Sequence, residues 1–305
     1  MTMPVGPDNI SNTVDALAAR RFFNRSARHG PPLDVLAREV ERRMAERLDY
    51  IRLEPRRILD AGAGGGHGMS SLHRRYPKAL LVAIDSAHSV LKQAPIRSSF
   101  ALRARNFLGG NTQQLVCGDF SRLPFPAQTF QLLWSNLALA WAVNPLAVFK
   151  DFGRVLDVGG LVMFSTYGPD TLSELREAFA SVDSMPHALP FVDMHDVGDM
   201  LVAAGFCDPV MDMEVITLTY AHFDALLADL RLSGQLNAAG GRRRSLSGPR
   251  KFLAVQSAYE SLRKEGQLPM TIEVVYGHAW RAEPRVDSVG RDIIRMEFNR
   301  ARTRT

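Results

Sequence analysis

Hydrophobic and polar positions along the chain follow two different periods. In residues 34–50, DVLAREVERRMAERLDY, every fourth residue from Leu36 to Leu48 is apolar, and charged residues lie between them. This spacing places the apolar side chains on one face and predicts an amphipathic helix. Leu80–Ile84 is instead a continuous apolar run, which is typical of a strand buried on both faces of a parallel sheet.

The two kinds of segment alternate through most of the chain. Strands are predicted at residues 58–61, 80–84, 115–117, 130–134, 161–166, 210–218 and 271–280. Helices are predicted at about residues 11–22, 34–50, 68–76, 146–156, 170–179, 193–206, 222–234 and 249–264, with a further one after Asp85. The alternation indicates the α/β class: a doubly wound, seven-stranded, mostly parallel sheet with helices on both faces.

Glycine and polar residues mark the expected ends of these elements. We expect Gly159-Gly160 to end the helix before the fifth strand, and Gly205 to stop the helix at 193–206. Asp170 or Thr171 is the expected cap of the helix at 170–179. Residues 97–112 lack a periodic pattern and are expected to form an insertion or a long loop.

Three units follow from this pattern. Residues 1–50 are expected to form an N-terminal helical lid. Residues 51–281 are expected to form the main domain, with a basic helical insertion at about 219–268 before the last strand. Residues 282–305 are expected to be a basic tail, because seven arginines and four acids lie from Arg281 onward.

The net charge of +5 is concentrated in this tail and in a second cluster. The members of that cluster are Arg242, Arg243, Arg244, Arg250 and Lys251. A basic patch can bind nucleic acid, a membrane surface or an acidic protein, or it can be a solvated loop. No nucleic-acid-binding motif accompanies it, so a nucleic-acid partner is not expected.

Other features of the composition narrow the class of protein. No apolar run approaches the roughly 20 residues that span a bilayer, and the N-terminal residues lack a signal-peptide core, so a cytoplasmic protein is expected. Cys117 and Cys207 lie in apolar stretches and are expected to be buried free thiols. The eight histidines are scattered without metal-ligand spacing, so no metal site is expected.

The first definite chemical signal is RRILDAGAGGGHG at residues 56–68. Gly62, Gly64 and Gly66 lie between a predicted strand and its helix, where backbone N–H groups can approach a ligand closely. The G-x-x-x-x-G-K-[ST] pattern of a Walker loop is missing. Asp85 ends the next strand, where an acid can accept hydrogen bonds from two ribose hydroxyls. The alternative for Asp85 is a helix cap.

Asp60 distinguishes between the ligands that such a loop can hold. A carboxylate beside the glycines would repel a pyrophosphate, which disfavours a nicotinamide dehydrogenase. It suits a ligand with an amino group and a positive sulfur, and S-adenosylmethionine has both and no phosphate. The alternative is that Asp60 only orders the loop, by accepting hydrogen bonds from its backbone N–H groups.

Further segments resemble the class I S-adenosylmethionine-dependent methyltransferases over about residues 55–166. They are Gly118-Asp119-Phe120, LPFPAQTFQLLWSN at 123–136 and RVLDVGGLVMFST at 154–166. The resemblance implies that Asp119 meets the adenine amine and Phe120 the adenine ring. The cofactor-binding residues expected in total are Asp60, Gly62, Ala63, Gly64, Gly66, Asp85, Ser86, Asp119, Phe120 and Asn136.

Segments outside this core narrow the resemblance. ARRFFNRSAR, SNLALAW, TYGPDTLSELREAF, LPFVDMHDVGDMLVAAGF and TIEVVYGHAW follow one another in the order found in the malonyl-acyl-carrier-protein O-methyltransferases of biotin synthesis. The resemblance covers roughly residues 18–281. It implies methyl transfer to the free carboxylate of a malonyl thioester, and an acidic acyl carrier protein that docks on the basic cluster at 242–251.

The substrate side is less sharply defined. Candidates for positioning the substrate are Trp141, Tyr167, Arg176, His187, Tyr276 and His278. Core packing explains the aromatic residues among them equally well. Gly30 stands where these relatives usually have a tyrosine, and Ala140 where they tend to have His or Gln. Both departures concern the substrate rather than the cofactor.

Three alternatives therefore stay open. The segments at 169–176 and 190–201 also resemble the methyltransferase-like assembly factors of respiratory complex I, which are linked to arginine hydroxylation of a partner subunit. A methyltransferase that acts on another small or carrier-bound acid is possible. So is a protein that has kept the fold and lost its activity.

Overall fold

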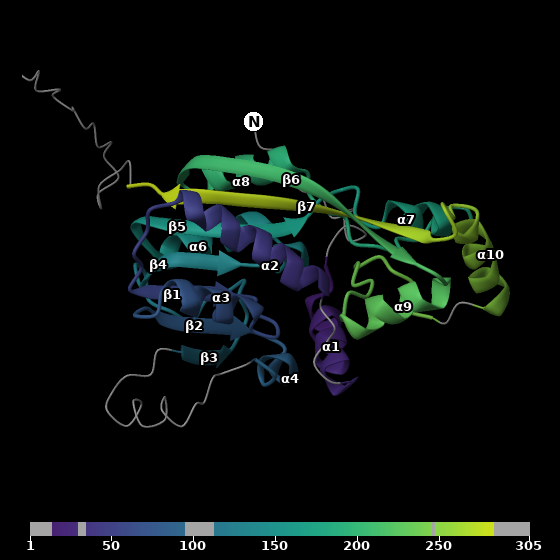
Figure 1. The fold of residues 1–305 in the computed structure, drawn as a ribbon, viewed down its shortest axis with the longest axis horizontal. Coiled ribbons are helices and arrows are strands. Elements are labelled where there is room, and N and C mark those ends of the chain that lie inside the picture. Colours follow the sequence, from purple (N-terminus) through teal and green to yellow (C-terminus); the bar gives the residue numbers. More distant parts are fainter. Residues whose placement is uncertain (1–13, 30–34, 95–112, 246–247, 284–305) are drawn as a thin grey trace, which may run out of the picture.

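The computed structural model describes residues 14–29, 35–94, 113–245 and 248–283. Seven strands form one sheet (Figure 1). They are β1 Arg57–Ala61, β2 Leu80–Asp85, β3 Gln113–Cys117, β4 Phe130–Ser135, β5 Leu156–Tyr167, β6 Phe206–Tyr220 and β7 Leu268–Arg281. Gly30, the whole segment 97–112 that is expected to be an insertion, and most of the basic tail lie outside the described residues.

The strand order is β3-β2-β1-β4-β5-β7-β6, which confirms the expected seven-stranded, mostly parallel sheet. Strands β1 to β5 pair in parallel, whereas β7 pairs antiparallel with both β5 and β6. The order reverses direction between β1 and β4. In open α/β sheets ligands bind at such a reversal, beyond the carboxyl ends of the strands.

Helices cover both faces of the sheet and extend past one of its ends. The helices are α1 Ala16–Ser26, α2 Val35–Arg47, α3 His67–Arg75, α4 His88–Leu91, α6 Pro145–Val155, α7 Ser173–Ala180, α8 Met194–Ala203, α9 Phe223–Leu232 and α10 Pro249–Glu260. Three short 3₁₀ turns are η2 Ala27–His29, η3 Leu48–Tyr50 and η4 Leu139–Trp141. Figure 1 shows α7, α9 and α10 beyond the main body, along the far ends of β6 and β7.

Side chains of each strand alternate between the two faces, and this sorts them into two cores. Ile58 and Trp134 pack in the core that includes α2 and α3. Leu59 and Leu133, their neighbours along β1 and β4, pack in the core that includes α6 and α8. Asp60 follows Leu59 and therefore points toward α2 and α3.

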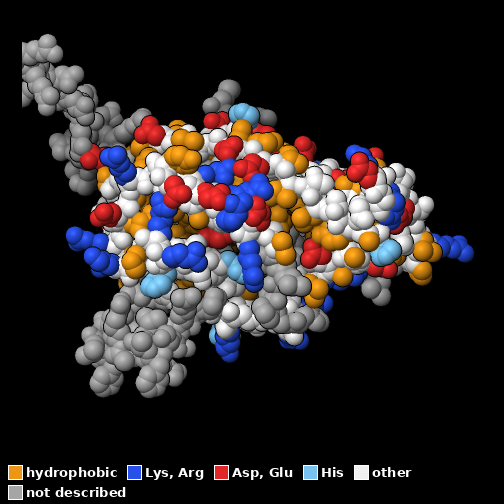
Figure 2. All heavy atoms as spheres, in the orientation of Figure 1, with side chains coloured by type: hydrophobic (Ala, Val, Ile, Leu, Met, Phe, Trp, Pro, Cys, Tyr) orange, Lys and Arg blue, Asp and Glu red, His pale blue; other side chains and the backbone are white. Residues whose placement is uncertain are grey.

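Helix α2 belongs to the sheet's core, which corrects the expected division at residue 50. The four apolar side chains of the predicted stripe, from Leu36 to Leu48, are all buried in one cluster with side chains of the sheet and of α3. Ion pairs of Arg43 and Arg47 with Glu214 also join α2 to β6. Figure 2 shows acidic and basic side chains mixed over this part of the surface. Of the two N-terminal helices, α1 is the one that covers the site described below.

Truncation of Met44 tests this assignment. Met44 is fully buried, so Met44→Ala leaves a cavity and is expected to lower the free energy of unfolding by about 2–5 kcal/mol in urea denaturation. Val35→Ala on the same helix is the control, because Val35 is 67% exposed, and its expected change is within about 0.5 kcal/mol. A change below 1 kcal/mol for Met44→Ala would contradict the placement of α2 in the core.

Three local expectations were wrong. Helix α6 passes directly into β5 at Leu156, and Gly159 lies within that strand with a φ of 75° instead of ending the helix. Helix α7 has no side-chain cap, because Thr171 donates its hydroxyl to the Glu273 carbonyl and Leu172 enters the helix in a left-handed conformation. Cys117 is exposed and Cys207 is partly exposed, since both lie toward the sheet's edges.

Candidate cofactor and substrate site

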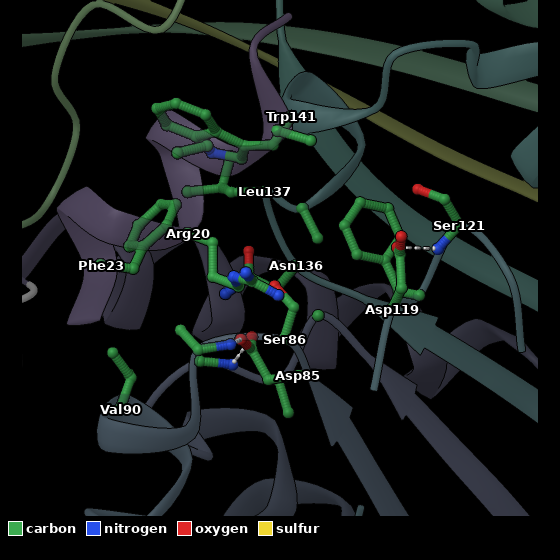
Figure 3. A pocket seen from close by; sticks show the side chains of 18 of the residues that line it. Arg20, Phe23, Asp85, Ser86, Val90, Asp119, Ser121, Asn136, Leu137 and Trp141 are labelled. Carbon is green, nitrogen blue, oxygen red and sulfur yellow. Dashed lines mark hydrogen bonds between the residues drawn. The ribbon is translucent and has the colours of Figure 1, made fainter. Parts of the chain in front are cut away.

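A cavity of about 640 Å³ lies beyond the carboxyl ends of β1 to β4, at the reversal of strand order (Figure 3). Its volume is within the range of small-molecule sites, about 300–1,000 Å³. Nine of the ten residues expected to bind the cofactor line it: Asp60, Gly62, Ala63, Gly64, Asp85, Ser86, Asp119, Phe120 and Asn136. Gly66 lies one step further along the loop, as the left-handed N-cap of α3.

The glycine loop keeps its shape because two of its positions have no room for a side chain. A Cβ on Gly62 would lie 2.2 Å from the Ala138 Cβ, and Gly62 has a φ of 76°. A Cβ on Gly68 would lie 2.8 Å from the Asp60 Oδ2 atom. The N–H of Gly62 donates to the carbonyl of Ile84 at 2.9 Å, so the loop is tied to β2. These contacts hold the loop close to the cavity.

Asp85 accepts a hydrogen bond from the backbone of the glycine loop. The sequence had suggested this ordering role for Asp60. The Oδ2 of Asp85 accepts the N–H of Gly64 at 2.8 Å, and its Oδ1 accepts the N–H of Ala87 at 2.7 Å, just before α4. Burial raises the pKa of Asp85, and the two backbone hydrogen bonds act against that rise. Each carboxylate oxygen still has a free lone-pair direction, and the side chain borders the cavity (Figure 3).

Asp60 is a buried carboxyl group whose Oδ2 has no hydrogen-bond partner among the described residues. It is 2% exposed and borders the cavity. Burial raises its pKa well above the usual value, and the charges of Glu41 and Asp85 raise it further. An unpartnered buried acid is costly in free energy, and a cationic ligand group in the cavity would offset that penalty.

Glu41 brings a second buried acid from α2 to the vicinity of Asp60. Its Oε2 accepts the indole N–H of Trp134 at 2.9 Å, and its Oε1 accepts the Ser71 hydroxyl at 2.5 Å. Burial raises the pKa of Glu41, although both hydrogen bonds lower it. Sequence reasoning missed this residue, because the helical stripe predicts Glu41 on the polar side of α2.

Asp119 and Asn136 occupy the expected region but already have protein partners. The Oδ1 of Asp119 accepts the N–H of Ser121 at 2.8 Å (Figure 3). The amide of Asn136 donates to the Ala37 carbonyl at 2.9 Å and accepts the Ser165 hydroxyl at 2.8 Å. Asn136 therefore joins α2, β4 and β5 beneath the cavity.

Helix α1 contributes a row of residues that the sequence did not single out. Leu17, Arg20 and Phe23 all line the cavity, and Arg20 points into it (Figure 3). The Phe23 ring packs edge-on against Trp141, with centroids 5.0 Å apart. Their spacing of three residues in the sequence could have indicated this row, because residues three apart are neighbours on the surface of a helix.

Both ends of α1 are fastened to other parts of the chain. At its start, the Asp15 N–H donates to the Ala238 carbonyl at 2.7 Å. At its end, Asn24 accepts the Ser89 N–H at 2.9 Å, and Gln93 donates to the Ala27 carbonyl at 2.6 Å. These contacts position α1 over the cavity, between the loop after α9 and the α4 region.

The structure separates the six expected substrate residues into three groups. Trp141 and Tyr167 line the cavity, and the Tyr167 ring lies 5.4 Å from that of Phe191. Arg176 and His187 instead line a second, smaller cavity.

Tyr276 and His278 line neither cavity, which corrects their assignment to the substrate side. Tyr276 is buried, with the Arg47 guanidinium of α2 at 3.8 Å from its ring centre. His278 lies two residues further along the same face of β7 and is half-buried, and this burial lowers its pKa.

Several side chains of the basic cluster at 242–251 are paired with acidic side chains of the protein. Arg242 donates to Asp15 at 2.9 Å and to the Ala239 carbonyl, so it serves to hold the start of α1. Arg243 and Lys251 both lie near Asp183, at 3.8 and 3.3 Å. Arg243, Arg244 and Arg250 are exposed, and the Arg244 side chain, 3.9 Å from Asp15, is 76% exposed.

Comparison with known proteins agrees with this site. The family described as a methyltransferase domain matches residues 59–164. A malonyl-[acyl-carrier protein] O-methyltransferase from Gallionella capsiferriformans is 46% identical over 93% of this chain and 97% of its own length. Its counterpart from Laribacter hongkongensis is 48% identical over 92% of this chain and 95% of its own length. The chain belongs to the malonyl-[acyl-carrier protein] O-methyltransferase family.

Solved structures agree on the fold. The YcgJ protein of Bacillus subtilis has a TM-score of 0.55 with 13% identity, over 81% of this chain and 99% of that chain. The [4+2]-cyclase SpnF has a TM-score of 0.52 with 17% identity, over 87% of this chain and 94% of that chain. These similarities support the class I methyltransferase fold. Among the described residues, no helix is long and apolar enough to cross a membrane.

The cofactor of this methyltransferase is S-adenosylmethionine, and the cavity fits it. The unpartnered Asp60 carboxyl group suits the amine at the methionine end. Asp85 and Phe120, which are expected to meet the ribose and the adenine, line the same cavity. Trp141 and Tyr167 also line this cavity and give it an aromatic wall.

Proposed function

We propose that this chain methylates the free carboxylate of a malonyl thioester carried on acyl carrier protein, a reaction of biotin synthesis. The observation that carries the proposal is the extent of the match with the O-methyltransferase relatives. It covers more than nine-tenths of the chain, whereas the general methyltransferase family matches only residues 59–164. The additional parts include α1 and the segment after α9, which supply Arg20, Phe23 and Gln235 to the cavity.

The chemistry requires little from the chain except binding and orientation. When bound, S-adenosylmethionine supplies an electrophilic methyl group on a positively charged sulfur. The acceptor carboxylate is already ionised at neutral pH, so no general base has to remove a proton. Correct positioning of the two reactants can supply on the order of 7–11 kcal/mol of barrier reduction.

The residues of the cavity divide this task between them. Asp60 and Asp85 hold the cofactor from below, on the ends of β1 and β2. Phe23 and Trp141 form an apolar wall that excludes water from the acceptor, which leaves its carboxylate less solvated and more reactive. Arg20 of α1 offers a guanidinium group, which pairs with carboxylates in a two-point geometry.

Intact mass spectrometry of malonyl-acyl carrier protein, incubated with the chain and S-adenosylmethionine, tests the proposal. We expect a mass gain of one methyl group that requires both the enzyme and the malonyl group. Unacylated carrier protein and succinyl carrier protein are the controls for acceptor identity. No gain on malonyl carrier protein, when S-adenosylmethionine binding is demonstrated separately, would contradict the proposal, and a gain on the succinyl form alone would identify another acid.

The carrier protein is also the expected macromolecular partner. Acyl carrier proteins are acidic, and the exposed Arg244 and Arg250 give this side of the molecule a positive charge suited to them. Arg242 is a poor choice for a docking test, because removing it would also release Asp15 and α1. Since the substrate belongs to fatty-acid synthesis, we place the reaction in the cytoplasm.

A further inference from the structure

A second cavity of about 290 Å³ opens beside α7. None of the residues that line it has a role in the methyl transfer proposed above. It is lined by Arg176 of α7 and by the segment from Asp183 to Pro190. Lys251 of α10 and Arg243 reach Asp183 from the other side. Two segments thus line the hollow with ionisable side chains, and two further cations lie close to its acid.

Two ionisable side chains of this hollow are largely buried and held by other groups of the chain. The side chains of Asp183 and His187 are 13% and 14% exposed and are joined by a hydrogen bond of 2.7 Å. The His187 ring stacks on Phe179 at 3.8 Å, and Arg176 donates to the Pro169 carbonyl. These contacts fix the side chains in place before any ligand arrives.

The charges around the hollow do not balance. Asp183 is the one acid and Arg176 the one permanent cation in its lining, and two further cations, Arg243 and Lys251, lie close to Asp183 outside that lining. The hydrogen bond from His187 is the largest cause that lowers the pKa of Asp183 to about 2, so this acid is already counted as ionised. The excess of positive charge in a concave, partly buried place favours an anion.

The second cavity is continuous with the wall of the cofactor cavity. Leu189, which lines the second cavity, packs in one apolar cluster with Ala19 of α1 and with Trp141. Phe191 follows two residues later and contacts Tyr167. The four residue-to-residue steps from His187 to Phe191 can span at most about 14 Å. An anion in the second cavity would therefore lie within the reach of an extended chain from the methyl acceptor's position.

We propose that the second cavity binds the phosphodiester group of the pantetheine arm that carries the malonyl thioester. This inference rests on the proposed function, and it names the part of the substrate that Arg176, Arg243 and Lys251 recognise. A phosphodiester is a permanent anion with several acceptor oxygens, which matches guanidinium and ammonium donors. The arm would run from this anion past Leu189 and Phe191 to the wall at Tyr167.

The test compares acceptors with and without the phosphate. Wild type and the double variant Arg243→Gln/Lys251→Gln are assayed with malonyl-pantetheine, malonyl-coenzyme A and malonyl-acyl carrier protein. The variant is expected to raise KM about tenfold for the carrier protein, with kcat retained, and to leave KM for malonyl-pantetheine within about twofold. Lys150→Gln on the exposed face of α6 is the matched control, because it removes one charge away from both cavities.

Binding gives a second measurement that does not depend on turnover. Calorimetry is expected to show tighter binding of 4′-phosphopantetheine than of pantetheine to wild type, and the loss of this preference in the double variant. Equal KM changes for malonyl-pantetheine and for the carrier protein, or no phosphate preference in wild type, would overturn the proposal. A change confined to malonyl-coenzyme A would also overturn it, because the site would then serve a free nucleotide thioester.

The two proposals can fail separately. If wild type methylates no malonyl thioester, the proposed function fails, and the calorimetric preference still decides whether the second cavity binds a phosphodiester. If all three thioesters are methylated and the double variant treats them alike, the function stands and the phosphodiester site is wrong.

Discussion

Asp85→Ala is expected to weaken the binding of S-adenosylmethionine by about 100-fold or more in calorimetry. The variant loses the carboxylate that we propose accepts two ribose hydroxyls, and each hydrogen bond to a charged group contributes about 1.5–3 kcal/mol. A sum of about 3 kcal/mol corresponds to roughly 100-fold in affinity. The loop also loses the hydrogen bonds from Gly64 and Ala87, which adds to the effect.

Two controls separate ribose binding from loop order. Asp151→Ala removes another aspartate that accepts a backbone N–H, that of Leu123, outside the cavity, and its affinity should not change. An S-adenosylmethionine analogue without ribose hydroxyls should bind wild type weakly and lose much less on Asp85→Ala. If both ligands lose the same factor, Asp85 orders the loop and does not bind the ribose.

The affinity for S-adenosylmethionine is expected to rise with pH, because Asp60 must be ionised to pair with the cofactor's ammonium group. In the free enzyme, burial and the nearby Glu41 and Asp85 raise the pKa of Asp60, so binding releases a proton. Below that pKa the affinity should increase about tenfold per pH unit, and above it the affinity should level off. Calorimetry in buffers of different ionisation enthalpy measures the released proton directly.

Folding stability of the free enzyme should show the opposite trend with pH. The unfolded chain loses the Asp60 proton at about pH 4, whereas the folded chain keeps it until its raised pKa. Between these two values the folded state holds more protons, so the free energy of unfolding falls as pH rises. Bound cofactor should reduce this fall.

Two variants identify the group responsible. Asp60→Asn should bind the cofactor at least tenfold more weakly at high pH and should lose the pH dependence. Glu41→Gln should shift the midpoint of the dependence to lower pH, because a charge that raises the pKa of Asp60 is removed. Since the two acids interact, the midpoint belongs to the pair. An unchanged pH profile in Asp60→Asn would assign the proton to another group.

The sequence was most informative where a function depends on neighbours along the chain. The loop from Asp60 to Gly66 and the acid at Asp85 follow two adjacent parallel strands, whose carboxyl ends meet at one edge of the sheet. Their positions in the cavity could therefore be predicted from strand order alone. The helical stripe of α2 was predicted for the same reason, since its period is a local property.

The substrate residues were predicted less well, because an aromatic residue that packs in the core and one that lines a binding cavity occur in similar sequence patterns. Tyr276 and Tyr167 lie on neighbouring strands, β7 and β5, and have similar apolar surroundings. One packs under Arg47 of α2, and the other lines the cavity. Both side chains lie on the same face of the sheet, so only the position along the strand distinguishes them, and that position depends on the antiparallel register of β7.

The sequence by itself thus determined the sheet, its layers and the cofactor loop, together with the family of the enzyme. Only the tertiary structure decided that α1 covers the cavity, that Glu41 lies beside Asp60, and that Arg242 holds Asp15 across 227 positions of the chain. The physical reason is that periodicity and turn chemistry act between near neighbours in the chain. Charges and lids are instead brought together by the packing of segments that are distant in sequence.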